Sequence, residues 1–297
     1  MFKQILVPLD GSHLAEAALQ PAALIAATLN APVTLLHIIE QDAPREIHKE
    51  HHLTQADEAR TYLREVARRA FPPGVKVDVH VHSAAVEDVA ESIVEHAQEE
   101  FEPDLIVMCS HGKDGVRDLL FGSIAQQVIA RGTTPLLLVR PDKGNTFQFH
   151  KIFVPLDSES AHDESLPLAE DLARAFSGEI HLFSVIPTFG TLSGQQAATG
   201  SMLPATTAAL LEIKEDEARE HLQEHVNTLR ASGQRATAEV VRGDPAAEIV
   251  KSAERSSASI IILCTHRKKG MGAFWSRSVA PKVANLSKLP LLLIPMK

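Results

Sequence analysis

Two glycines and a serine in the first half of this chain have a spacing suited to holding phosphates. Gly112 is separated by nine residues from Gly122, and Ser123 follows at once. Glycine lets the backbone approach a ligand closely, and the free amides at the start of a helix favour an anion. The segment from Gly112 to Ser123 is therefore a candidate for a phosphate cradle.

A regular alternation of strand and helix patterns must position these residues. Apolar runs at 4–9 and 33–39 are typical of buried parallel strands, and the spacing of apolar residues from Ala15 to Ile25 predicts a helix between them. The pattern continues as βαβαβαβαβ, which predicts a doubly wound parallel sheet. Further helices are expected at 53–70, 86–99 and 123–131, and further strands at 75–81, 104–109 and 136–139.

Ligands of such a sheet bind beyond the carboxyl ends of the strands. In this chain those ends carry Asp10-Gly11-Ser12, Ile38 and the loop that starts at Cys109. Because parallel strands end at the same edge, we expect these segments to meet there. The sequence therefore predicts one site assembled from three separate stretches of chain.

The whole arrangement occurs twice. Lys3–Asp10 returns 147 residues later as His150–Asp157, and the later strands return with an offset of 155. We name residues 1–142 copy 1 and residues 148–297 copy 2, and we expect each to be a domain with a five-stranded parallel sheet of its own. The extra residues of copy 2 fall in Thr188–Thr207, whose Gly, Ser, Thr and Ala predict a mobile loop before a helix at 210–230.

Composition narrows the class of protein. The chain has 297 residues, is 44% hydrophobic and carries a formal net charge of -9. This acidic balance argues against nucleic-acid binding, and no stretch is typical of a membrane span or a signal peptide. Its two cysteines, Cys109 and Cys264, occupy matching positions in the two copies and form no disulfide framework. We therefore expect a cytoplasmic globular protein.

At its motif residues the chain resembles the universal stress protein family, and the resemblance covers essentially all 297 positions as a tandem pair. ATP-binding members of that family carry Gly-x2-Gly-x9-Gly-Ser/Thr after the fourth strand. Gly112, Gly122 and Ser123 match this motif, whereas Cys109 stands where the first glycine is expected. The resemblance implies a Rossmann-like, adenine nucleotide alpha hydrolase-like fold, with the last strands of the two copies paired edge to edge at 136–139 and 291–294.

The resemblance also implies a binding site for ATP, or alternatively for AMP or ADP, with or without Mg²⁺. The residues it places around adenine and ribose are Pro8, Leu9, Asp10 and Ile38. Those it places along the phosphate loop are Met108, Cys109 and Gly112, and those that meet the phosphates from the helix start are Gly122, Ser123 and Ile124. The thiol of Cys109 enters space that glycine leaves empty, and we expect the site to tolerate it.

Copy 2 departs from the motif. Its loop starts at Cys264, and Arg267 and Arg277 replace the remaining two glycines while Ser278 is kept. Arginine cannot reproduce the backbone freedom or the small size of glycine, so we predict that copy 2 does not bind ATP in the family manner. The alternative is a basic pocket for another anion, to which the neighbouring lysines 268 and 269 would also contribute.

Several other residues have simpler interpretations. Asp157 and Ser278 suit helix N-caps, and the cysteines suit small buried positions. His48, His51 and His52 have helical spacings that could gather three imidazoles around a metal, but a solvated helix face is favoured. His111 and His266 lack a third residue that would complete a nucleophilic triad, and no Gly-Lys-Ser/Thr phosphate loop occurs.

The sequence thus favours a nucleotide-dependent stress regulator with little or no turnover. Copy 1 would bind the nucleotide, and a dimer of whole chains is a further expectation. Two alternatives remain: a scaffold that works through protein partners without nucleotide, and an enzyme that acts at the α-phosphate. The last lacks an evident acid/base pair.

Overall fold

The computed structural model describes residues 1–44, 46–47, 50–110, 123–141, 147–157, 163–192, 194–265 and 279–296. Copy 1 alternates strand and helix as predicted. Its elements are β1 (Ile5–Pro8), η1 (Ala15–Ala18), α1 (Leu19–Leu29), β2 (Val33–Glu40), β3 (Glu46–Ile47), β4 (Glu50–His51), α2 (Ala56–Ala70), β5 (Val77–Val86), α3 (Val89–Glu95), η2 (His96–Glu100), β6 (Leu105–Cys109), α4 (Ser123–Arg131) and β7 (Leu136–Val139).

Copy 2 repeats the order, and its counterpart of α2 is longer. Its elements are β8 (Lys151–Pro155), α5 (Ser165–Phe176), β9 (Glu179–Ile186), η4 (Phe189–Thr191), α6 (Gly194–Met202), α7 (Pro204–Ala231), β10 (Arg235–Arg242), α8 (Pro245–Arg255), β11 (Ile260–Thr265), α10 (Val279–Leu286) and β12 (Leu291–Pro295). Helix α7 corresponds to α2 of copy 1, and α8 corresponds to α3.

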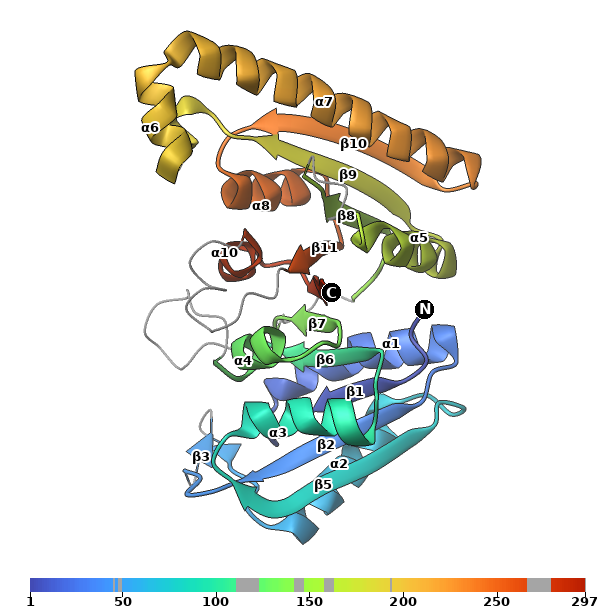
Figure 1. The fold of residues 1–297 in the computed structure, drawn as a ribbon. Helices are drawn as coiled ribbons and strands as arrows, with labels where there is room; N and C mark the ends of the chain where they lie inside the picture. Colours follow the sequence, from blue (N-terminus) through green and yellow to red (C-terminus); the bar gives the residue numbers. More distant parts are fainter. Residues whose placement is uncertain are drawn as a thin grey trace.

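The two copies share one ten-stranded sheet, in the order β10-β9-β8-β11-β12-β7-β6-β1-β2-β5 (Figure 1). Within each copy the strands are parallel, and the first strand is central. β7 and β12 pair antiparallel, with Leu136 opposite Leu293 and Leu138 opposite Leu291. The expected edge-to-edge pairing is therefore confirmed, and each strand covers an edge that the other would leave exposed.

Each face of this sheet carries one apolar layer that spans both copies. Helices α1, α2, α5 and α7 pack on one face, and α3, α4, α8 and α10 pack on the other (Figure 1). Alternate residues of a strand enter opposite layers: Leu137 belongs to the first, whereas Leu136 and Leu138 belong to the second. Because side chains on a strand alternate between faces, a strand covered on both sides is apolar throughout.

Equivalent helices keep the same capping chemistry in both copies. The side chain of Asp88 accepts a hydrogen bond from the amide of Glu91 at 3.0 Å, and that of Asp244 accepts one from Ala247 at 3.0 Å. These caps satisfy amides that have no partner within the helix. The Asp88 cap explains why α3 begins at Val89 and not at residue 86 as predicted.

The prediction of a mobile loop at Thr188–Thr207 is wrong. This segment holds η4, α6 and the start of α7, which begins at Pro204 and not at residue 210. Proline is preorganised for the first turn of a helix, and Leu211 of α7 is buried against Ile186. The small-residue composition gave a wrong prediction because Ile186 and Leu211, which flank the segment, give it an apolar surface on which to fold.

Copy 1 also differs from expectation next to the strand ends. Strand β5 extends to Val86, which pairs with Glu40, and a short hairpin of β3 and β4 precedes α2. Helix α2 begins at Ala56 and not at residue 53, because Leu53 is buried against the loop after β1. Within the described residues, every helix is too short or too polar to cross a membrane.

Candidate functional site

The predicted site lies where the strand order of copy 1 reverses direction. β1 is flanked by β2 on one side and β6 on the other, with Pro8 opposite Leu36 and Leu6 opposite Ile106. The carboxyl ends of these three strands therefore share one edge, which brings Asp10, Ile38 and Cys109 into one region of the fold. Open α/β sheets bind ligands at such a reversal because the connections leave it in opposite directions.

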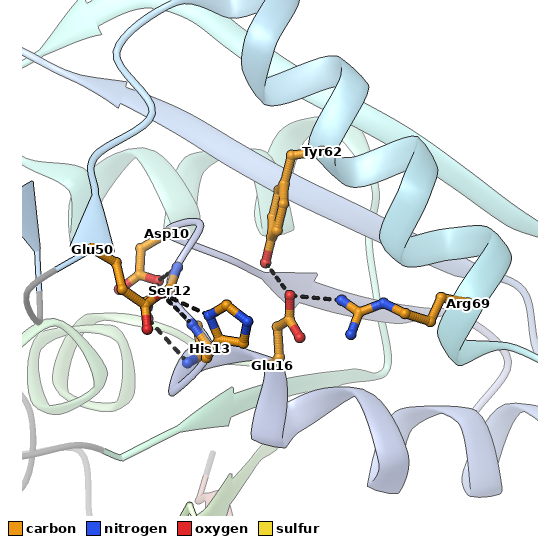
Figure 2. Close-up of polar contacts among 8 residues, drawn as sticks. Asp10, Ser12, His13, Glu16, Glu50, Tyr62 and Arg69 are labelled. Carbon is orange, nitrogen blue, oxygen red and sulfur yellow. Dashed lines mark hydrogen bonds and ion pairs between the residues drawn. The ribbon is translucent and has the colours of Figure 1, made fainter.

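The loop after β1 is held in one conformation by its own polar groups (Figure 2). Oδ1 of Asp10 accepts hydrogen bonds from the amide of Ser12 at 2.9 Å and from its hydroxyl at 2.7 Å. Oγ of Ser12 in turn accepts from the amide of Ala15 at 3.2 Å. This chain of hydrogen bonds fixes the Asp10 carboxylate at the edge of the sheet.

His37 on β2 and Leu53 in the segment before α2 close over this loop. The buried His37 ring lies between two backbone oxygens, with Nδ1 2.8 Å from that of Leu9 and Nε2 3.0 Å from that of Leu53. Gly11 has a φ of +92°, and a Cβ at that position would lie 2.7 Å from Cδ1 of Leu53. Glycine is therefore required here by both backbone conformation and space.

Cys109 is a buried, neutral thiol at the end of β6. Its relative exposure is 8%, and burial, with a smaller contribution from the charge of Asp10, raises its pKa to about 12. Burial likewise raises the pKa of Cys264 in copy 2 to about 11. Both thiols remain protonated near neutral pH, so neither is a ready nucleophile.

Charged and aromatic side chains surround the outer side of the loop (Figure 2). Oε1 of Glu16 accepts from the Tyr62 hydroxyl at 3.2 Å and from the Arg69 guanidinium at 2.8 Å. Burial and the Glu16 charge raise the pKa of Tyr62 above its ordinary value. His13 lies 3.0 Å from Glu50, whose hydrogen bond raises the pKa of the imidazole. These contacts anchor η1 to α2 and to the hairpin.

The structure brings part of the predicted residue set together. Leu9, Ile38, Met108 and Cys109 are buried at the shared edge, with Pro8 and Asp10 partly exposed beside them. Ser123 and Ile124 begin α4, and Ile124 is 37% exposed. Several predicted residues lie outside the described part of the chain: Gly112 and Gly122, the two histidines 111 and 266, and in copy 2 Arg267, Lys268, Lys269, Arg277 and Ser278.

Comparison with known proteins places this architecture in a family. The family model described as "Universal stress protein family" matches residues 1–140 and again 148–295. The chain belongs to the universal stress protein family. Its tandem arrangement and its mostly parallel α/β sheet agree with the resemblance drawn from the motifs.

This universal stress protein has relatives that are similar in sequence and others that are similar in structure. Universal stress protein MJ0531 of Methanocaldococcus jannaschii is 32% identical over 152 residues, which are 48% of this chain and 85% of the relative. MJ0577 of the same organism is 29% identical over 160 residues, which are 47% of this chain and 96% of the relative. Each therefore corresponds in length to about one copy.

Solved structures show the same fold over the full length. A universal stress protein from Archaeoglobus fulgidus has a TM-score of 0.73 and 18% identity, covering 99% of this chain and 96% of the other. The functionally unknown protein PA1789 from Pseudomonas aeruginosa PAO1 has a TM-score of 0.70 and 17% identity, covering 99% of this chain and 93% of the other. At these identities the likeness concerns the fold alone.

The histidines singled out by sequence do not form the predicted helical face in this universal stress protein. His51 lies on β4, with Nε2 3.2 Å from Glu58, and His52 is buried with Nδ1 3.2 Å from the backbone oxygen of Pro44. His48 lies outside the described residues. The helical prediction was wrong because His51 lies in a β-hairpin, and the pairing of two strands is not visible in the spacing of the histidines.

Sequence reasoning missed two other groups of metal-ligating side chains. His80, His96 and Glu100 meet beside β5, and Asp163, His221 and His225 meet in copy 2. The spacing of His221 and His225, four residues apart on a helix, was a usable signal. Their carboxylate partner was not, because it lies 58 residues from the nearer histidine.

A shallow groove lies at the opposite end of copy 1. It has a volume of about 510 Å³ and is lined by Met1, Phe2, Asp104, Thr133 and Leu168 among others. This is the amino end of strands β1 and β6, so it is remote from Asp10 and Cys109. The candidate site therefore remains the one at the carboxyl ends of these strands.

Proposed function

We propose that copy 1 binds ATP, or alternatively AMP or ADP, and that the protein acts as a nucleotide-dependent regulator in the stress response with little or no turnover. The observation that carries the proposal is the position of Asp10, just after β1, and of Cys109, at the end of the adjacent strand β6, at the reversal point of the sheet. Residues 1–142 and 148–297 are, in this proposal, two domains with separate roles.

The chemistry of the described residues suits the sugar and base of a nucleotide. Pro8 is partly exposed at the edge, and the buried Leu9 and Ile38 end the two apolar layers of the sheet beside it, so this edge is apolar and suits a flat aromatic base. The Asp10 carboxylate is oriented by Ser12 and is suited to accept hydrogen bonds from ribose hydroxyls. Together these groups would recognise a nucleoside before the phosphates are considered.

Cys109 is compatible with phosphates in this proposal. Its pKa is raised to about 12, so the side chain carries no negative charge that would repel an anion. The phosphates would extend toward the start of α4, whose first-turn amides and dipole favour negative charge. A divalent cation such as Mg²⁺ would accompany the phosphates as part of the ligand.

Calorimetric titration of the nucleotide-free chain with ATP, ADP and AMP, with and without Mg²⁺, tests the proposal. Gly122→Arg copies the arginine that copy 2 carries at position 277 and is expected to abolish binding. Ser278→Ala, in the degenerate copy, is the matched control and should leave binding unchanged. Asp10→Ala should weaken binding by about 1–3 kcal/mol, whereas Asp157→Ala should not.

One nucleotide per chain, lost on Gly122→Arg, is the expected result. If binding survives Gly122→Arg but is lost when copy 2 is altered, the nucleotide site lies in copy 2 and its assignment to copy 1 is wrong. If no heat is observed at several temperatures while circular dichroism shows an intact fold, the nucleotide proposal is wrong.

The second candidate function is a scaffold that acts through protein partners. It is favoured by exposed apolar side chains on α6, on α7 and at the junction between them: Met202 is 81% exposed, and Leu203, Leu210 and Ile213 are each more than half exposed. Apolar groups gathered on one surface are typical of a contact site. An intact protein that binds no nucleotide but whose association state changes on Met202→Glu, as measured by sedimentation, would support this candidate.

A further inference from the structure

Three metal-ligating side chains of copy 2 converge between α5 and α7. His221 and His225 are four residues apart on α7 and so share one face of the helix, and Asp163 lies just before α5. Nε2 of His221 is 3.3 Å from Oδ1 of Asp163, and Nε2 of His225 is 3.1 Å from Oδ2. One potential ligand atom from each residue lies within 4.8 Å of the other two.

These distances fit a metal ion. Zinc binds imidazole nitrogen and carboxylate oxygen at about 2.0–2.2 Å, and two ligands of a tetrahedral ion at such lengths lie roughly 3.3–3.6 Å apart. The distance from Nε2 of His221 to Oδ1 of Asp163 and that from Nε2 of His225 to Oδ2 are each close to this separation. The three groups therefore lie close enough together to surround one ion.

The surroundings are those of a partly shielded cation site. The side chains of Asp163, His221 and His225 are 19%, 23% and 26% exposed, which leaves one side open to water. Two imidazoles and a carboxylate suit first-row transition metals, whereas Mg²⁺ and Ca²⁺ prefer oxygen ligands throughout. Three protein ligands and one open position are typical of zinc sites that retain a bound water.

Copy 1 uses the same place in the fold differently. Glu16 precedes Asp163 by the 147 residues that relate the first strands of the copies, and it too contacts the following long helix. Its partners there are Tyr62 and Arg69, and a guanidinium has no lone pair to give a metal. A carboxylate thus joins equivalent elements in both copies, but in copy 2 two imidazoles take the place of these partners.

We propose that Asp163, His221 and His225 form a binding site for a divalent transition metal ion, with zinc the best suited, which ties α7 to the start of α5. Each neutral imidazole would keep its proton on Nδ1 and give its Nε2 lone pair to the metal, while the carboxylate gives an oxygen. The site lies in copy 2, so it is separate from the nucleotide site proposed for copy 1.

The group beside β5 provides an internal comparison. There, Glu100 lies 3.5 Å from Nδ1 of His80 and 3.6 Å from Nε2 of His96, and its side chain is 48% exposed. The distances from this carboxylate to the imidazoles are longer than in the proposed site, and the carboxylate is more exposed to water. We therefore expect this group to hold zinc less tightly. His96→Gln therefore serves as the matched control for a ligand change in the proposed site.

The test is titration of the metal-stripped full chain with Zn²⁺ against a chromophoric chelator, with Co²⁺ absorption as a second readout. His221→Gln and His225→Gln remove the imidazole but keep an N–H donor for Asp163, which preserves the link between the helices. We expect one tight zinc per chain, at least a roughly tenfold loss of affinity in each variant, and little change in His96→Gln. Zinc should raise the thermal midpoint of the unaltered chain more than that of either variant.

Four results would overturn the proposal. The first is that the unaltered chain binds no zinc, and the second is that all three variants bind zinc equally well. The third is that only His96→Gln loses binding, and the fourth is a Co²⁺ spectrum typical of octahedral oxygen ligands. The first would mean that the cluster is only a hydrogen-bonded link between helices. The Co²⁺ spectrum is recorded on the unaltered chain, so it decides the question even if a variant fails to fold.

Discussion

Replacing Gly11 with alanine would test the closure of the loop after β1. Gly11 has a φ of +92°, and an added Cβ would lie 2.7 Å from Cδ1 and 2.8 Å from Cγ of Leu53. Gly74 offers a matched control, because it has a φ of +103° but no heavy atom within 4 Å of the added Cβ. The two substitutions therefore share backbone strain and differ in the steric clash.

The magnitudes follow from these two contributions. Backbone strain at such a φ costs about 1–3 kcal/mol, which is the full cost expected for Gly74→Ala. Overpacking against the buried Leu53 adds about 1–3 kcal/mol, so Gly11→Ala should cost roughly 2–6 kcal/mol. In a Leu53→Ala background the clash disappears, and the cost of Gly11→Ala should fall to that of Gly74→Ala.

Urea unfolding of the full chain, followed by circular dichroism, measures these differences as shifts in the transition midpoint. The four proteins of the Gly11/Leu53 double-mutant cycle give the coupling between the two positions directly. The reasoning is refuted if Gly11→Ala costs no more than Gly74→Ala, or if the Leu53→Ala background leaves its cost unchanged.

Three further predictions concern side chains elsewhere. Iodoacetamide should alkylate both thiols slowly at neutral pH and faster as pH rises, because burial raises the pKa of Cys264 to about 11 and that of Cys109 to about 12. Cys264 should therefore react before Cys109, and fast labelling of Cys109 in the folded protein would contradict this. Glu50 raises the pKa of His13, so their interaction stabilises the fold below the ordinary pKa of histidine and is lost as pH rises through the raised value. NMR titration should show that pKa falling in Glu50→Gln, and an unchanged value would argue against the contact. Arg140→Ala should lower the unfolding free energy by about 1–2 kcal/mol, since two backbone oxygens at the end of α10 lose their charged donor, and unchanged urea stability would count against that role.

Much of the fold could be predicted from local patterns. The apolar runs gave the central strands, and the repeat of Lys3–Asp10 at His150–Asp157 gave the duplication, because both are properties of contiguous residues. Boundaries were predicted less well where distant contacts decide them. Leu53 would continue a helix by its own pattern, but its burial over Gly11 keeps it outside α2. The helices in Thr188–Thr207 likewise depend on apolar neighbours from β9.

The candidate site shows the same division. Sequence alone pointed to Asp10, Ile38 and Cys109 as residues that follow or end strands. The family was indicated by the motif that Gly112, Gly122 and Ser123 match. Tertiary structure decided that strands β1, β2 and β6 are neighbours, that His37 fastens the loop between them, and that Asp163 meets the imidazoles of α7. Residue types and periodicity are properties of the sequence itself, whereas contacts between residues 28 to 100 positions apart arise only when the sheet is assembled.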